Sequence, residues 1–167
     1  MPHYGTLAEA DAYHAARGRS SWGDATEPDR VAALVRASDY VDARYLYERH
    51  GCWVSMFPGE PTLGRLQERA WPRTGAADIA PDEVPIEVER ATYEAAFREL
   101  ENPGVLMPDY VPGEQVTRVK VGPIEESYAT AAEVGGPPNL PLVLAVDRIL
   151  AGLLCQRPSF GIGVRVV

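Results

Sequence analysis

The sequence predicts a mainly α fold of about four helices with a small β-hairpin, long ordered loops and an extended C-terminal strand. Apolar residues recur at helical spacing in four segments. The 15 prolines and 15 glycines cluster in a few stretches between those segments, which is typical of long, shaped loops. The 167 residues, 46% hydrophobic and 24% charged, match an ordinary globular protein of one domain.

Two helices are predicted before residue 51. Thr6 and Glu9 have the spacing of a capping box, in which each side chain satisfies a free backbone N–H, and Gly18 ends that helix. The second helix begins near Thr26 and continues toward Gly51. The residues that follow the spacing of one face of this helix are Val31, Leu34, Val35, Ser38, Val41, Asp42 and Tyr45.

Helical spacing disappears over residues 51–81. A loop of this length inside a small domain is usually functional or disordered. Trp53, Phe57 and Trp71 favour order, because large aromatic side chains are usually buried. We therefore expect an ordered, extended loop, and a short helical turn around residues 63–70 is left open.

A third helix and a hairpin are predicted next. Pro85 suits the first helical position, where its missing N–H costs nothing, and the Asn-Pro-Gly sequence at 102–104 ends the helix. After an irregular segment, residues 117–121 alternate between apolar and charged side chains, as in a half-buried strand. A Gly-Pro turn then leads to residues 124–128, which are expected to pair with them.

The C-terminal part is predicted to hold one helix and a strand. Asn139 can cap a leucine-rich helix over residues 140–154. We divide the chain into a helical domain over residues 1–157 and a docking tail over residues 158–167. The apolar side chains of the tail are Phe160, Ile162, Val164 and Val166. With no neighbouring strand in sequence, this tail is a candidate for pairing with another protein.

The net charge of −8 bears on the partners of the chain. Proteins that bind nucleic acid through phosphates need clustered Lys and Arg, yet Lys120 is the single lysine and the arginines are scattered. A membrane-surface role is disfavoured for the same reason. We expect DNA to pass such a surface without specific binding.

No arrangement of residues predicts catalysis, a cofactor or a metal. The nucleophile candidates Cys52 and Cys155 and the bases His3, His14 and His50 lack any recognisable active-site spacing. We expect His14 on a helix surface, Cys155 in the core, and His50 at a helix C-terminus. Two isolated thiols and the absence of an apolar leader predict synthesis in the cytoplasm.

One cluster in the long loop is a candidate for a subunit interface. Trp71, Pro72 and Arg73 form a stiff corner in a Pro/Gly-rich stretch. One interpretation is that Trp71 anchors the loop to its own core. The other is that Arg73 and its neighbours contact an adjacent subunit, because Trp and Arg are enriched at interface hot spots.

These segments resemble a known family. The motifs are a Tyr-Gly start, Trp22 before the second helix, Leu66-Gln67, Ala70-Trp71-Pro72-Arg73, Val84-Pro85, Val119-Lys120-Val121-Gly122-Pro123, Tyr128 and a leucine-rich last helix. Over roughly residues 4–154 the chain resembles the head–tail connector (adaptor) proteins of long-tailed bacteriophages and gene transfer agents. Some members carry the label "DnaT-like single-stranded-DNA-binding protein".

The resemblance implies a non-enzymatic adaptor in the neck of a virion. Its implied partners are other copies of itself in a dodecameric ring, the portal protein, and the next neck protein, a stopper or tail terminator. In that context the tail is expected to dock on the portal, and the alternative is a third strand beside residues 116–128. An accessory single-stranded-DNA-binding protein is the second hypothesis for function, and an enzyme with an unrecognised site is the third.

Overall fold

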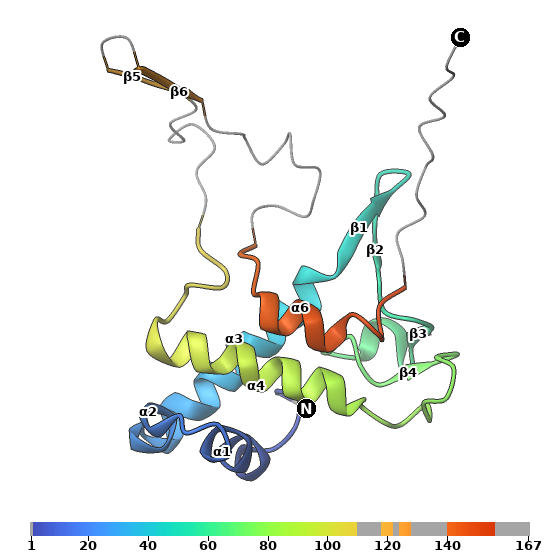
Figure 1. Ribbon diagram of the computed structural model, residues 1–167. Coiled ribbons are helices and arrows are strands. Elements are labelled where there is room, and N and C mark those ends of the chain that lie inside the picture. Colours follow the sequence, from blue (N-terminus) through green and yellow to red (C-terminus); the bar gives the residue numbers. More distant parts are fainter. Residues whose placement is uncertain (1, 110–117, 122–123, 128–139, 156–167) are drawn as a thin grey trace, which may run out of the picture.

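The computed structural model describes residues 2–109, 118–121, 124–127 and 140–155. The predicted mainly α class is confirmed, since five α-helices lie within these ranges (Figure 1). They are α1 (Leu7–Ala15), α2 (Ser20–Asp24), α3 (Glu27–Arg44), α4 (Ile86–Glu101) and α6 (Leu144–Leu150). The short helix α2, which carries the buried Trp22, is an addition to the predicted set.

The described strands form three antiparallel pairs. They are β1 (Leu46–Arg49) with β2 (Cys52–Ser55), β3 (Glu60–Pro61) with β4 (Arg73–Thr74), and β5 (Arg118–Val121) with β6 (Ile124–Ser127). The last pair is the predicted hairpin, and its register sets Val121 opposite Ile124. The 51–81 loop is ordered, as expected, and its helical turn is the 3-10 helix η1 (Gly64–Leu66).

The helix starts follow the capping signals in the sequence. Thr6 accepts a hydrogen bond from the backbone N–H of Glu9, and the Glu9 carboxylate accepts one from the backbone N–H of Thr6. Thr26 caps α3 through the backbone N–H of Asp29, with Pro28 in the first turn. Both predicted starts are therefore confirmed, and α4 begins directly after Pro85.

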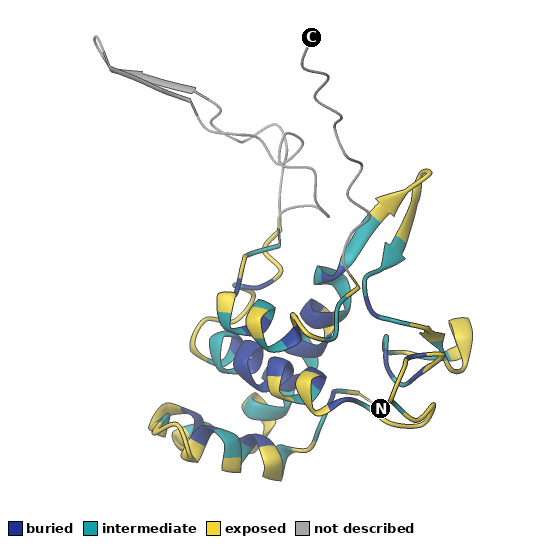
Figure 2. Cartoon of the chain, turned by 45° about the vertical axis from the view of Figure 1, so that its right-hand side comes forward, coloured by how far each residue is buried: buried dark blue, intermediate teal, exposed yellow. Residues whose placement is uncertain are grey.

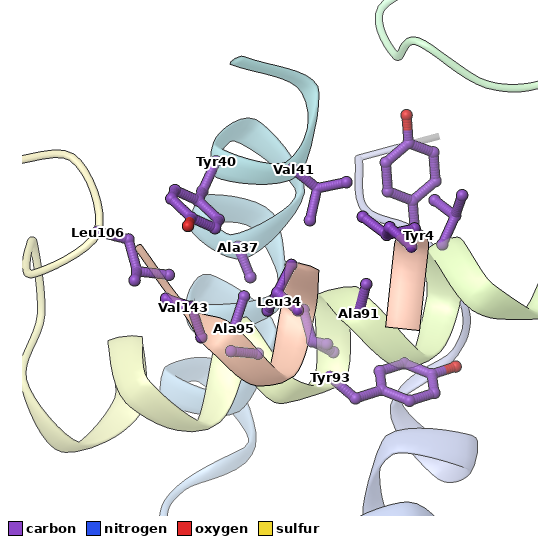
Figure 3. Packing of buried hydrophobic residues seen from close by; sticks show 14 of the residues in the cluster. Tyr4, Leu34, Ala37, Tyr40, Val41, Ala91, Tyr93, Ala95, Leu106 and Val143 are labelled. Carbon is purple, nitrogen blue, oxygen red and sulfur yellow. The ribbon is translucent and has the colours of Figure 1, made fainter. Parts of the chain in front are cut away.

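The core is centred on the contact between α3 and α4 (Figure 3). Alanines at Ala33 and Ala37 of α3 and at Ala91 and Ala95 of α4 are fully buried. Small side chains let two helix backbones approach closely, and larger neighbours such as Leu34 fill the remaining space. Buried residues gather along this contact in Figure 2, whereas exposed residues mark the hairpin tip and the outer helix faces.

Helix α6 packs on α4 and is shorter than predicted. It begins at Leu144 and not at Leu140, and the Asn139 cap lies outside the described residues. The hydroxyl of Tyr40 donates to the carbonyl of Pro141 at 2.6 Å, which ties the preceding segment to α3 in a non-helical conformation. None of the described helices has the length and apolar content that crossing a bilayer would require.

The end of the second predicted helix is wrong. Helix α3 stops at Arg44, and residues 46–55 form the hairpin β1–β2. His50 and Gly51 have positive φ angles of 50° and 75°, the conformation of a tight two-residue hairpin turn. His50 is thus a turn residue and not a cation at a helix C-terminus.

His14 is also placed differently from the prediction. It is fully buried, between Trp22 with ring centroids 4.2 Å apart and Phe97 at 5.5 Å. Helix α1 packs against α2 and α4, and His14 lies on the side of α1 that faces them. His14 therefore belongs to the core and not to a helix surface.

Candidate docking site

The predicted cluster at Trp71 lies inside the subunit. Trp71 is 2% exposed, and its ring packs edge-on against Phe57 with centroids 5.8 Å apart. The peptide bond to Pro72 is cis. The backbone N–H of Trp71 donates to the Tyr4 hydroxyl at 3.1 Å. This geometry agrees with Trp71 anchoring the loop, whereas its role in a subunit interface stays a prediction.

Arg73 is held by carbonyl groups. Its guanidinium donates to the carbonyls of Pro58 at 2.7 Å, Gly59 at 2.5 Å and Ala70 at 3.1 Å, and the residue is 3% exposed. Burial lowers the pKa of Arg73 from its usual value. The guanidinium thus closes the loop from within and does not project from it.

A partly buried polar network connects this corner to the N-terminus and α3. Tyr4 donates from its hydroxyl to the Asp42 carboxylate at 2.5 Å, and Arg69 lies 2.5 Å from Asp39 and 3.4 Å from Asp42. Burial raises the pKa of Asp42, although the hydrogen bond from Tyr4 and the charge of Arg69 act in the opposite direction. Three segments far apart in sequence are thereby fixed to one another.

A groove of about 630 Å³ opens beside this anchored corner. It is bordered by the segment from Thr62 to Pro72 and by Pro81 and Asp82. Gln67 shapes it, because its amide nitrogen donates to the carbonyls of Arg69 and Pro72 and its amide oxygen accepts from the N–H of Leu63. The loop is therefore ordered by polar contacts and not by burying its leucines. Leu63 is 65% and Leu66 91% exposed at the groove.

The hairpin β1–β2 exposes a second apolar group. Figure 1 shows the hairpin projecting from the helical body. Trp53 is 52% exposed and stands opposite Glu48, while Arg49 and Cys52 lie on the other face of the ribbon. A two-stranded hairpin alone is marginally stable in water, so an exposed tryptophan on it indicates a contact surface.

The predicted nucleophiles show no catalytic setting within the described residues. Cys52 and Cys155 are free and exposed, so the expectation of a core position for Cys155 is wrong. The backbone N–H of Cys155 donates to the carbonyl of Met56, which holds the chain at the protein surface beside β2. No group of three His, Cys, Asp or Glu residues in the described ranges is arranged to hold a metal ion.

Comparison with known proteins identifies a family. The family model described as "Putative DnaT-like ssDNA binding protein" matches residues 3–167. The chain belongs to this family. No curated protein and no solved structure matches the chain. The label expected from the resemblance is thus confirmed, and the question for a DnaT-like chain is whether its surface can hold DNA.

More than half of the arginines with described side chains in this DnaT-like protein are paired with carboxylates of the same subunit. Seven of them lie 2.5 to 3.6 Å from a carboxylate oxygen of the same chain. They are Arg17, Arg19, Arg30, Arg36, Arg44, Arg69 and Arg98. Glu94 alone pairs with three, and although burial acts against it, hydrogen bonds from Arg19 and Tyr13 lower the pKa of Glu94. These guanidinium groups stabilise the fold and leave little charge for phosphates.

Arginines without a salt bridge to a described residue are dispersed in the DnaT-like chain. They are Arg49, Arg65, Arg73, Arg90 and Arg148, on β1, η1, β4, α4 and α6 respectively, and of these Arg73 is buried. A single-stranded-DNA site needs a basic groove with stacking aromatics. The described residues provide one exposed tryptophan, Trp53, but no cluster of unpaired arginines around it.

Sequence reasoning found only part of this site. It selected Trp71, Pro72 and Arg73, of which Trp71 and Pro72 line the groove, while Trp71 and Arg73 are almost fully buried. It missed Leu63 and Leu66, which carry the exposed apolar surface. Their signal was two leucines in a Pro/Gly-rich stretch without helical spacing. The tail residues Phe160, Ile162, Val164 and Val166 lie outside the described residues.

Proposed function

We propose that this chain is a structural head–tail connector (adaptor) subunit that forms a ring beneath the portal in the neck of a phage or phage-like particle. The observation that carries the proposal is the exposure of large apolar side chains around a complete core. They are Leu66 at 91%, Leu142 at 77%, Leu63 and Leu144 at 65%, and Trp53 at 52% exposed. Such surfaces are typical of protein–protein contacts.

The positions of these side chains support several contacts per subunit. They occur on the hairpin, on the groove and around the start of α6, which are separate parts of the sequence. A subunit of a closed ring needs two different patches for its two neighbours, and a further surface for each protein above and below. The proposal assigns no catalytic step and no cofactor to the chain.

The negative net charge of the subunit favours the passage of DNA through the ring over DNA binding. With a net charge of −8 and seven arginines already paired, the subunit offers few cations to neutralise phosphates. The family resemblance supplies the rest of the proposal: a dodecameric ring, contacts with the portal and the next neck protein, and a location in the virion.

Reconstitution tests this function directly. The purified chain is mixed with the portal and neck proteins encoded by the neighbouring genes, and the products are imaged by negative-stain electron microscopy. We expect rings of this chain seated on the portal. A chain that stays separate from the portal at every concentration tested contradicts the adaptor function.

Single-stranded-DNA binding is the second candidate, favoured by the family description and by Trp53 on the projecting hairpin. Base stacking on an exposed aromatic side chain contributes about 1–3 kcal/mol per base. Quenching of tryptophan fluorescence by oligo(dT), lost in Trp53→Ala, would support this candidate over the adaptor function.

A further inference from the structure

The hairpin and the groove are two separate surfaces that other described side chains leave exposed. The residues that line the groove come from positions 62–72 and 81–82, so none belongs to the hairpin at 46–55. Trp53 and the groove leucines Leu63 and Leu66 stay exposed in the same chain. Neither surface is therefore covered by the residues that the structure describes.

The two segments that border the groove differ in the exposed groups that they offer to a partner. Leu63 and Leu66 come from the first segment, while Asp82 and the adjoining Glu83 come from the second. The hydroxyl of Thr62 donates to the carbonyl of Pro81 at 2.6 Å, which ties the two segments together. Asp82 and Glu83 are exposed and form no salt bridge with a described residue.

The two faces of the hairpin carry groups that can contact the exposed groups of the groove. Trp53 is on one face of the ribbon, and Arg49 is on the other, because the two residues differ in strand alternation. Arg49 is exposed and forms no salt bridge with a described residue. A ribbon inserted between the borders can set its indole against the leucines and its guanidinium against the carboxylates. A groove of about 630 Å³ is large enough, since sites for drug-sized groups span about 300–1,000 Å³.

We propose that the β1–β2 hairpin of one copy of this chain docks in the 62–82 groove of the next copy, with Trp53 against Leu63 and Leu66 and Arg49 against Asp82 and Glu83. The two surfaces differ, so the contact is heterologous: the copy that inserts its hairpin keeps a free groove, and the copy that receives it keeps a free hairpin. Repetition of such a contact gives a ring or an open chain. The inference deepens the proposed function by naming the contact between ring neighbours.

The experiment uses two single variants of the full chain, Trp53→Ala and Leu66→Asp, and sedimentation velocity over a concentration series. Both residues are exposed, so we expect melting temperatures close to that of the wild type. Self-association should weaken more than about tenfold in each variant, as for an interface hot spot. The matched control is Met107→Asp, a methionine 46% exposed outside both surfaces, which should associate like the wild type.

Mixing the two variants tests the heterologous geometry. Trp53→Ala retains an intact groove and Leu66→Asp an intact hairpin, so the mixture can form one contact and should stop at a 1:1 dimer. A charge exchange gives a second test that does not depend on the apolar variants: Arg49→Glu should weaken association, and adding Asp82→Arg to it should restore association.

Three results would overturn the inference. They are a wild-type protein that stays monomeric up to its solubility limit, single variants that associate normally, and a mixture without the 1:1 dimer. Portal binding is measured on the same samples. If the variants associate normally and the wild type joins the portal, the hairpin–groove contact is rejected and the adaptor function stands. If the variants lose association as expected but the wild type does not bind the portal, the adaptor function is rejected and the hairpin–groove contact stands.

Discussion

The backbone N–H of Trp71 donates to the hydroxyl of Tyr4 at 3.1 Å, across 67 positions of sequence. The same hydroxyl donates to Asp42 on α3 at 2.5 Å. Burial and the adjoining Asp42 carboxylate raise the pKa of Tyr4, which keeps its proton on the hydroxyl. One phenol thus joins the N-terminus, the long loop and the central helix, and holds the border of the groove in place.

Replacing Tyr4 with Phe should therefore destabilise the subunit. The variant keeps the ring but leaves the Trp71 N–H and the Asp42 carboxylate without this partner. Loss of one partner of a buried hydrogen bond costs about 1–3 kcal/mol. Urea denaturation measures the change in the free energy of unfolding. Tyr47→Phe on the hairpin is the control, and equal stability of the two variants would show that the Tyr4 hydroxyl contributes nothing.

Trp71→Ala should cost more, because it removes a large buried ring. Truncation of a buried Phe or Trp costs roughly 3–5 kcal/mol. Trp71 is 2% exposed and packs on Phe57, so the melting temperature of the isolated subunit should fall. The exposed Trp53→Ala is the matched control and should change stability little. Normal monomer stability with lost assembly would instead assign Trp71 to a subunit interface.

His14 should make the stability depend on pH. Burial, together with the positive charge of Arg19, lowers the pKa of His14 to about 4, whereas an unfolded histidine titrates near about 6.5. As pH falls between these values the unfolded chain takes up the proton first. His14 therefore lowers the stability progressively from about pH 6.5 to about pH 4, by on the order of 3 kcal/mol in total.

The substitution His14→Phe isolates this effect. Phenylalanine fills the site between Trp22 and Phe97 and carries no proton. The free energy of unfolding is measured for both proteins from pH 4 to pH 7.5. As the pH falls from about 6.5 to about 4, we expect the free energy of unfolding of the wild type to decrease relative to that of His14→Phe. Above pH 7 the difference between the two proteins should be constant. Parallel curves over the whole range would contradict a depressed pKa.

The helical core could be predicted from the sequence, whereas the ends of its elements could not. Capping signals at Thr6 and Thr26 and apolar spacing on α3 and α4 are local, so they were visible. The end of α3 depends on distant contacts. Tyr45 donates to Asp147 at 2.8 Å and packs on Phe57, and these partners lie far along the chain.

The candidate site was predicted less completely for a similar reason. The sequence Trp-Pro-Arg predicted an arginine that projects from the loop. In the fold, four backbone carbonyls from residues 57–59 and 70 surround Arg73. No local sequence pattern predicts that these carbonyls surround the Arg73 guanidinium. The exposure of Leu66 follows from the Gln67 contacts that fix the turn, which are also invisible in sequence.

Purified protein should show no salt-sensitive binding to single-stranded DNA. The net charge of −8 and the paired arginines leave no described basic groove, and phosphate contacts provide most of such affinity. A gel shift at low micromolar protein in physiological salt is the measurement. A retarded band that weakens steeply as salt rises would favour the DNA-binding alternative.

The C-terminal tail gives the last prediction. Its sequence places Phe160, Ile162, Val164 and Val166 at alternating positions after Pro158. The last described residue before the tail is Cys155, whose N–H donates to the Met56 carbonyl at 2.8 Å, beside the base of the hairpin. An unpaired apolar strand is prone to aggregation. If the strand adds to a sheet of another protein, its backbone groups form hydrogen bonds and its apolar side chains are buried in pockets.

Because the resembled adaptors sit beneath a portal, we hypothesise that this tail docks on the portal, and deletion of residues 161–167 tests the idea. Docking requires a truncated chain that stays folded, melts like the wild type and no longer joins the portal in a pull-down. A control with Ile162, Val164 and Val166 all changed to Thr keeps the length and strand propensity but removes apolar contacts, and should also lose binding. If the truncated protein unfolds, the tail belongs to the subunit's own fold, as a third strand would. If it binds the portal at full affinity, the portal is held by another surface.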